Sequence, residues 1–146
     1  MIHKIEIHRL YDHNEIMSNS SIYAIFEQAE TIAKINIHTI ELSFIGNDEM
    51  QQLNAEYRNK NKATNILSFP QELDPIQGDI IVAVPTVISE CKDHNIPFHQ
   101  HLTHLLIHGY LHLAGFDHTT DKDAEMMESL EIQILHALHQ PNPYQE

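Results

Sequence analysis

The sequence predicts an α+β fold, in which a small mixed β-sheet is covered by helices within a single domain. Three observations support this fold class. A chain of 146 residues has the usual size of one domain and can bury one hydrophobic core. Short segments with strand-like patterns alternate with longer segments whose apolar residues recur at helical spacing. No repeat, linker or low-complexity tract divides the chain, so we expect one domain over residues 1–140 and a flexible C-terminal tail over residues 141–146.

The first half of the chain alternates between strand and helix patterns. Ile5 and Ile7 lie on one face of an expected N-terminal strand, opposite polar residues. The helix that follows has a candidate N-cap among residues 18–20, and a later short helix begins with Asn47 as its expected cap and acidic residues in its first turn. The expected elements are, in order, a strand over 2–10, a helix over 19–35, a strand over 35–46 and a helix over 47–57.

Proline and glycine mark most element boundaries in the second half. Pro70 is expected to end a short strand, because proline is tolerated at strand ends and edges. A turn at Gly78 and Asp79 is expected to open a buried strand, and Thr120 is the expected cap of the last helix. The expected elements are a loop over 58–65, strands over 66–70 and 78–84, a helix over 85–94, a helix that opens at Pro97 and a helix over 121–138.

Composition narrows the class of protein. The 21 acidic residues outnumber the 8 Lys and Arg residues, and the formal charge of −13 opposes non-specific attraction to nucleic acid. Cys91 is the only cysteine, so a metal ion would have to be held by His and carboxylate side chains. The N-terminal segment lacks a continuous apolar stretch of the kind found in secretion signals and membrane anchors. We therefore expect a cytoplasmic protein without a membrane partner.

The segment HGYLHLAGFDH, residues 108–118, has the spacing of a zincin-like metal helix. His108 and His112 are four residues apart and share one helix face. Gly115 suits the positive φ at a helix end, which would let the chain reverse and bring His118 to the same point. Three His ligands with one open position are typical of catalytic zinc, whereas structural zinc usually has four protein ligands. We expect one zinc ion, although three imidazoles also suit nickel or copper.

Gly109 stands where metzincin peptidases carry the glutamate that acts as general base. Its place inside a helix has two explanations, which are compatible: room beside the metal, or a close contact between helix and sheet. In either case the usual carboxylate is absent, which disfavours peptide hydrolysis. With 13 His in the chain, a chance pair such as His104 and His108 is also easily found. We expect His104 and His101 to face solvent or to orient a ligand, and Asp117 to serve mainly in a turn.

Three motifs in this chain resemble those of the YbeY endoribonucleases. HGYLHLAGFDH is similar to that family's H-G-x-L-H-L-x-G-[YF]-D-H signature, residues 53–70 (LNAEYRNKNKATNILSFP) are similar to its L-N-x-x-Y-R segment ending in L-S-F-P, and GDI at 78–80 is similar to its strand entry. The similarity spans nearly the whole chain, with the motifs in the same order. Asn65 departs from the pattern, because Asp is more common there.

This resemblance implies a function, a cofactor and partners. Domain 1–140 would be a metal-dependent hydrolase: a single-strand-specific endoribonuclease that acts in 16S rRNA 3′-end maturation and ribosome quality control. It would hold one zinc ion on His108, His112 and His118. Its partners would be ribosomal RNA or the ribosome, with ribosomal proteins and an assembly GTPase as further candidates.

The resembling family has an arginine that is required for activity, and Arg58 occupies the matching position in this chain. A guanidinium can bind a phosphate through two hydrogen bonds and offset charge in the transition state, and Lys60 and Lys62 add basic charge nearby. We also expect Ser68 and Phe69 to line the cleft, where Phe69 would stack on a base. Two rival functions stay open: a zinc peptidase of metzincin-like geometry, and a non-catalytic ribosome-assembly factor whose metal is structural.

Overall fold

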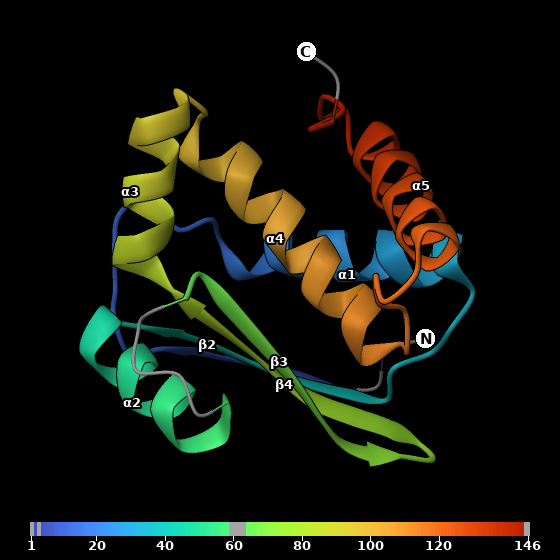
Figure 1. Ribbon diagram of the computed structural model, residues 1–146, viewed down its shortest axis with the longest axis horizontal. Coiled ribbons are helices and arrows are strands. Elements are labelled where there is room, and N and C mark those ends of the chain that lie inside the picture. The colour runs from blue at the N-terminus through green and yellow to red at the C-terminus, as the bar shows by residue number, and fades with distance from the viewer. Residues whose placement is uncertain (1, 3, 59–63, 145–146) are drawn as a thin grey trace.

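The computed structural model describes residue 2 and residues 4–58 and 64–144, with the side chains of Tyr57 and Arg58 outside the described part. Within these ranges the chain forms one α+β domain of four strands and five helices (Figure 1). In chain order the elements are β1 (Lys4–Arg9), α1 (Asn19–Ala33), β2 (Thr39–Ile45), α2 (Asn47–Arg58), β3 (Ile66–Leu73), β4 (Ile76–Ala83), α3 (Val84–His94), α4 (Phe98–Leu113) and α5 (Asp121–Ala137).

The four strands form one mixed sheet in the order β1-β2-β4-β3. β1, β2 and β4 run parallel, and β3 pairs antiparallel with β4. β3 is therefore an edge strand, and only one of its two edges is paired in the sheet. The predicted small mixed sheet is confirmed.

One face of the sheet carries the main hydrophobic core. α1 and α4 pack against this face, and α5 lies beside both helices (Figure 1). Leu42 and Ile80 from the strands meet Phe26 from α1 and Leu106 and Tyr110 from α4, and all five side chains are fully buried. α4 crosses both β3 and β4, so part of this helix lies next to the edge strand β3.

The opposite face of the sheet is only partly covered. Met50 of α2 is buried against Ile45 and Leu67 in a second, smaller apolar cluster. Beyond this cluster the face is polar, and Glu6 of β1 and Glu41 of β2 are direct partners in the parallel pairing. The sheet is thus covered fully by helices on one face and partly on the other.

Pro70 does not end its strand, contrary to the prediction. β3 continues to Leu73, with an irregularity in its pairing between Pro70 and Glu72. The carbonyl of Asn65 accepts the N–H of Ala83 at 2.9 Å. Because bonded pairs alternate along an antiparallel ladder, the N–H of the residue at position 70 would point away from β4. A proline there costs no ladder hydrogen bond, and the strand runs on.

Three other boundaries differ from the prediction. Gly78 and Asp79 lie inside β4, which begins at Ile76, rather than in a turn before it. β2 begins at Thr39, not near residue 35. Asn47 is the first residue of α2, and its side-chain oxygen accepts the Thr86 hydroxyl at 2.7 Å. Asn47 therefore ties α2 to α3.

The predicted helix caps at both ends of the chain are confirmed. Ser18 caps α1 by accepting the N–H of Ser21, and Thr120 caps α5 by accepting the N–H of Asp123.

Among the described residues, no helix is both long and apolar enough to cross a bilayer.

Candidate metal centre

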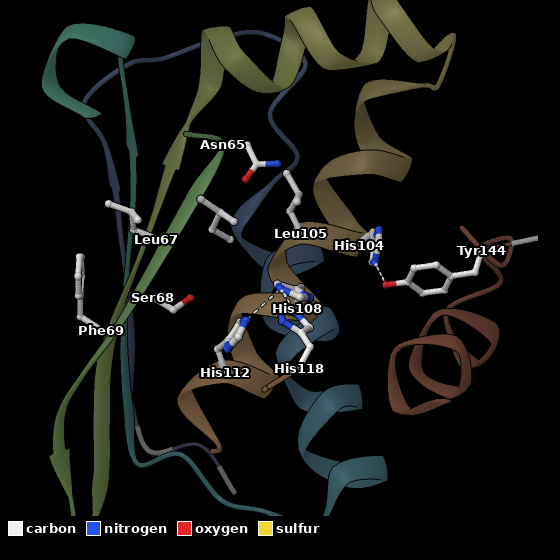
Figure 2. Close-up of a pocket in the computed structure, with 11 residues that line it drawn as sticks. Asn65, Leu67, Ser68, Phe69, His104, Leu105, His108, His112, His118 and Tyr144 are labelled. Carbon is white, nitrogen blue, oxygen red and sulfur yellow. Dashed lines mark hydrogen bonds between the residues drawn. The ribbon is translucent and has the colours of Figure 1, made fainter. Parts of the chain in front are cut away.

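α4 positions two of the three predicted metal ligands on one face. His108 and His112 are one turn apart and lie at the end of the helix nearest β3 (Figure 2). The helix ends in a turn in which the N–H of Phe116 bonds the carbonyl of Leu111 at 3.0 Å and the N–H of Gly115 bonds that of His112 at 3.1 Å. This pair of bonds defines a Schellman motif, which needs a left-handed residue after the helix. Gly115 supplies it with a φ of 102°, as predicted.

The reversed chain brings His118 to the two helical histidines. Nε2 of His108 lies 3.0 Å from Nε2 of His112 and 3.4 Å from Nε2 of His118. For a zinc–nitrogen bond of about 2.0–2.1 Å, the ligands of a tetrahedral ion are separated by about 3.4 Å. Both distances are close to this spacing and the three nitrogens lie within 4.8 Å of one another, so the group could hold a metal ion.

Burial keeps at least one of these imidazoles in the form that binds metal. Burial, together with the neighbouring His108 and His118, lowers the pKa of His112 to about 4. A metal ligand must offer an unprotonated nitrogen. His112 is therefore neutral at physiological pH, with its lone pair available.

A buried carboxylate lies behind His108. Glu131 of α5 is fully buried, and its Oε2 accepts Nδ1 of His108 at 2.6 Å. Burial raises the pKa of Glu131, but hydrogen bonds from His104, His108 and Tyr144 outweigh burial and bring the pKa to about 2. The carboxylate is therefore charged at neutral pH. A hydrogen bond from Nδ1 of His108 leaves Nε2 as the nitrogen that faces the other two histidines.

The three histidines lie in an open pocket of about 620 Å³ between β3, α4 and the C-terminal segment (Figure 2). Ser68 points into this pocket, as predicted, whereas Leu67 and Phe69 point away from it. Neighbouring residues of a strand face opposite sides of the sheet, so Phe69 packs beside the smaller apolar cluster instead. Phe69 is among the residues that line the pocket, as expected, but its ring points away from the pocket, which disfavours the expected stacking on a base. The residues that line the pocket are Asn65, Ile66, Leu67, Ser68, Phe69, His104, Leu105, His108, His112, His118 and Tyr144.

Gly109 makes the close contact between helix and sheet that was one of its two predicted roles. A Cβ atom there would lie 3.2 Å from the Ser68 hydroxyl and from Ile66, and 3.3 Å from Ile80. These distances are tighter than ordinary van der Waals contact. A side chain at this position would require these neighbouring side chains to shift by a few tenths of an ångström.

Arg58, Asp117 and His101 are not among the described residues that line the pocket. Arg58 is the last residue of α2, and its side chain lies outside the described part of the chain, as do Lys60 and Lys62. Asp117 accepts the backbone N–H and the hydroxyl of Thr119 at 3.2 and 3.0 Å, which confirms its role in a turn. His101 contacts Glu90 rather than the metal cluster, at 2.9 Å.

The fold and the site together define a class of protein: an α+β domain with a candidate three-histidine metal centre at the end of a long helix. Comparison with known proteins identifies the family. A family profile described as "Endoribonuclease YbeY" matches residues 6–139. The chain belongs to this family.

Individual relatives support the assignment. A protein of Bartonella bacilliformis named "Endoribonuclease YbeY" is 41% identical over 155 aligned residues, covering 97% of this chain and 98% of its own. A protein of the same name from Francisella tularensis subsp. novicida is 45% identical over 116 residues, covering 73% and 72% of the two chains. The solution structure of TM1509 from Thermotoga maritima covers 100% of both chains with a TM-score of 0.59 at 22% identity, which shows a shared fold.

Two residues of the site were not predicted from the sequence. Glu131 and Tyr144 form a hydrogen bond behind His108. A signal for Glu131 was present, since it lies at helical spacing from Met127 and Ile134 in the apolar stripe of α5. A carboxylate in such a stripe indicates a buried charge that needs partners. Tyr144 carries no comparable signal.

Proposed function

We propose that this chain is an endoribonuclease that cuts single-stranded RNA with one zinc ion held by His108, His112 and His118. The observation that carries the proposal is the convergence of three imidazole nitrogens in an open pocket, in a chain of the endoribonuclease family. Nickel or another divalent ion also suits three imidazoles.

We assign different residues to different roles in the cleavage of a phosphodiester bond. Zinc, if bound, would supply a Lewis acid and would activate water for attack. His108, His112 and His118 would hold the ion, and Ser68 offers a hydroxyl on the facing strand. We assign Arg58 the binding of a phosphate through two hydrogen bonds and the stabilisation of charge in the transition state.

The charge of the pocket suits an anionic substrate better than the net charge suggests. Of the pocket-lining residues that the structure describes, none is a carboxylate. The acidic side chains of Glu6 and Glu41 lie on the open face of the sheet instead. A phosphate that enters the pocket therefore meets imidazoles and hydroxyls at close range.

In the cell we propose that the substrate is ribosomal RNA, and that the protein acts in the cytoplasm in 16S rRNA 3′-end maturation and ribosome quality control. Ribosomal proteins and an assembly GTPase are the further partners that we propose. Mapping the ends produced by the purified protein on immature small ribosomal subunits tests this part. Cuts scattered over the RNA, with none near the 3′ end, would count against maturation.

The activity itself is tested by cleavage of a fluorescent single-stranded RNA by the zinc-loaded protein. We expect His112→Ala and Arg58→Glu to slow cleavage at least about 100-fold, the scale of losing a group that stabilises the transition state. His99→Ala, an exposed histidine on α4, and Lys92→Glu, an equal change of charge on α3, are matched controls that should cut at the wild-type rate. Equal cleavage by all five proteins would reveal a contaminating nuclease and remove the proposal.

A zinc peptidase is the second candidate, and the open edge of β3 favours it. The bond between Asn65 and Ala83 sets the ladder so that the backbone groups of Ile66 and Ser68 point away from β4, toward the pocket. An extended peptide can pair with such an edge. Cleavage of an unfolded protein that is lost in His112→Ala, with RNA left intact, would favour the peptidase.

A further inference from the structure

Among the described residues, Glu131 is the one charged side chain that is fully buried. It occupies the apolar side of α5, one turn from Met127 and from Leu135. A charge without partners in such a place costs several kcal/mol, so its contacts indicate its purpose. Both carboxylate oxygens of Glu131 contact residues that line the pocket of the candidate metal centre.

The two oxygens of Glu131 have different partners. Oε2 accepts Nδ1 of His108 at 2.6 Å. Oε1 accepts the hydroxyl of Tyr144 and lies 3.4 Å from Nε2 of His104. One carboxylate therefore joins a metal-ligand histidine to a residue of the C-terminal segment.

A turn stabilised by a side-chain hydrogen bond brings Tyr144 to Glu131. The N–H of Tyr144 bonds the side chain of Asn142 at 2.8 Å, and its ring meets the ring of His104 edge-on at 5.6 Å. The ring points from the end of the chain toward His104 at the pocket (Figure 2). Residues 141–144 thus include a contact to the site, although they were expected to belong to a flexible tail; the boundary at residue 140 stays a prediction.

We propose that Glu131 is a positioning residue for the metal centre, and that Tyr144 acts through Glu131 to set how firmly His108 is held for a metal ion. Glu131 keeps the proton of His108 on Nδ1, so that the lone pair of Nε2 points to His112 and His118. The Tyr144 hydroxyl keeps Oε1 from turning away. The inference rests on the metal-binding part of the proposed function.

Metal affinity is the first test, measured by competition with a chromophoric zinc chelator at pH 7.5. Loss of a carboxylate that orients a metal-bound histidine commonly weakens metal binding about 10–100-fold. We expect Glu131→Gln to weaken zinc binding about 10-fold or more, and Tyr144→Phe to weaken it several-fold. Glu125→Gln, an exposed acid on the same helix, and Tyr23→Phe, an exposed tyrosine on α1, should match the wild type.

The imidazole tautomer of the metal-free wild type is the second test, and it does not depend on a variant that folds. Nitrogen chemical shifts of His108 should show a protonated Nδ1 and an unprotonated Nε2.

Glu131→Asp, which keeps the charge on a shorter side chain, should restore part of the zinc affinity that Glu131→Gln loses. A purely structural role would change the melting temperature and leave the tautomer and the metal affinity unchanged.

The outcomes separate this inference from the proposed function. If the wild type binds zinc but Glu131→Gln and Tyr144→Phe bind it equally well, the inference fails and the metal site stands. If the wild type and His112→Ala both fail to bind zinc, the metal-dependent function fails and the inference falls with it. Protonated Nε2 in wild-type His108 would also overturn the inference.

Discussion

At the scale of single residues, Asn65 joins the chain just before β3 to Glu90 of α3. Its Nδ2 donates to both oxygens of Glu90, at 3.1 and 3.3 Å. Oε1 of Glu90 is also 2.9 Å from Nε2 of His101. A neutral amide beside a carboxylate contributes donors, whereas an aspartate would add a second negative charge. The surroundings of position 65 in this chain therefore suit Asn, although Asp is more common in the resembling motif.

We expect Asn65→Asp to lower stability at pH 8 by about 1–2 kcal/mol, because a hydrogen bond to a charged group is replaced by like-charge repulsion. The loss should shrink as the pH falls toward 5, since the paired carboxylates bind a proton more readily in the folded state. Urea denaturation at both pH values measures the effect. Asn14→Asp, in an exposed turn, is the matched control and should show little change. A loss of equal size at pH 5 and pH 8 would contradict the charge explanation.

The grouping of the three candidate metal ligands was predictable from the sequence, but the residues behind them were not. The spacing of His108, His112 and His118 follows from helix geometry and one glycine turn, so local rules suffice. The contact between His108 and Glu131 joins two helices. Such a contact depends on how α5 docks on α4, which no local pattern specifies.

At the scale of elements, the end of α4 decides whether the third ligand reaches the other two. The Schellman turn at Gly115 carries the chain from the helical pair to His118. A Cβ added to Gly115 would meet nothing within 4 Å, so space does not require glycine there. The positive φ at this position is what requires glycine.

We therefore expect Gly115→Ala to lower stability by about 1 kcal/mol through backbone strain alone. The strain is relieved if the turn opens, which moves His118 away from the helical histidines and should weaken zinc binding several-fold. Thermal melting and chelator competition measure the two effects. Gly46→Ala is the control, because its Cβ would make an ordinary contact of 3.4 Å with Tyr11 at a φ that other residues adopt. Unchanged zinc affinity in Gly115→Ala would mean that the turn does not position His118.

Element types followed from sequence patterns, whereas several boundaries did not. Apolar spacing and polar caps are local, so α1 and α5 were predicted nearly to the residue. The length of β3 depends on its place at the sheet edge, where Pro70 is harmless. Strand order is a property of the tertiary fold, and sequence reasoning had no access to it.

At the scale of the whole molecule, Glu131 links stability to pH. Its pKa of about 2 lies below the ordinary value of 4.5. A carboxyl group with a lowered pKa in the folded state stabilises the fold fully above its ordinary pKa. That contribution is lost as the pH falls from 4.5 toward 2.

We expect the metal-free protein to lose about 3 kcal/mol of stability over this pH window from Glu131, at about 1.4 kcal/mol per pKa unit. Glu131→Gln should start less stable and show a flatter decline between pH 5 and pH 3. Denaturant unfolding in the presence of a chelator gives both curves. Glu125→Gln should run parallel to the wild type, and a Glu131→Gln curve that is also parallel would refute the assignment.

Metal removal distinguishes a catalytic site from a structural one across the whole fold. The main core consists of buried apolar side chains from the sheet, α1, α4 and α5, and the three histidines lie outside it at the pocket. His118 is exposed, so the ion would hold a surface segment and not the core. The metal-free protein should therefore unfold cooperatively, as a protein with an intact core does.

Zinc at 100 times its dissociation constant should then add about 2.7 kcal/mol of stability. For a domain of this size the melting temperature should rise by roughly 10 °C. His112→Ala should melt near the metal-free wild type and respond little to zinc. Calorimetry of the wild type with chelator and with zinc makes the comparison. A metal-free protein that shows no cooperative transition would instead support a structural metal, because binding energy in such sites is folding energy.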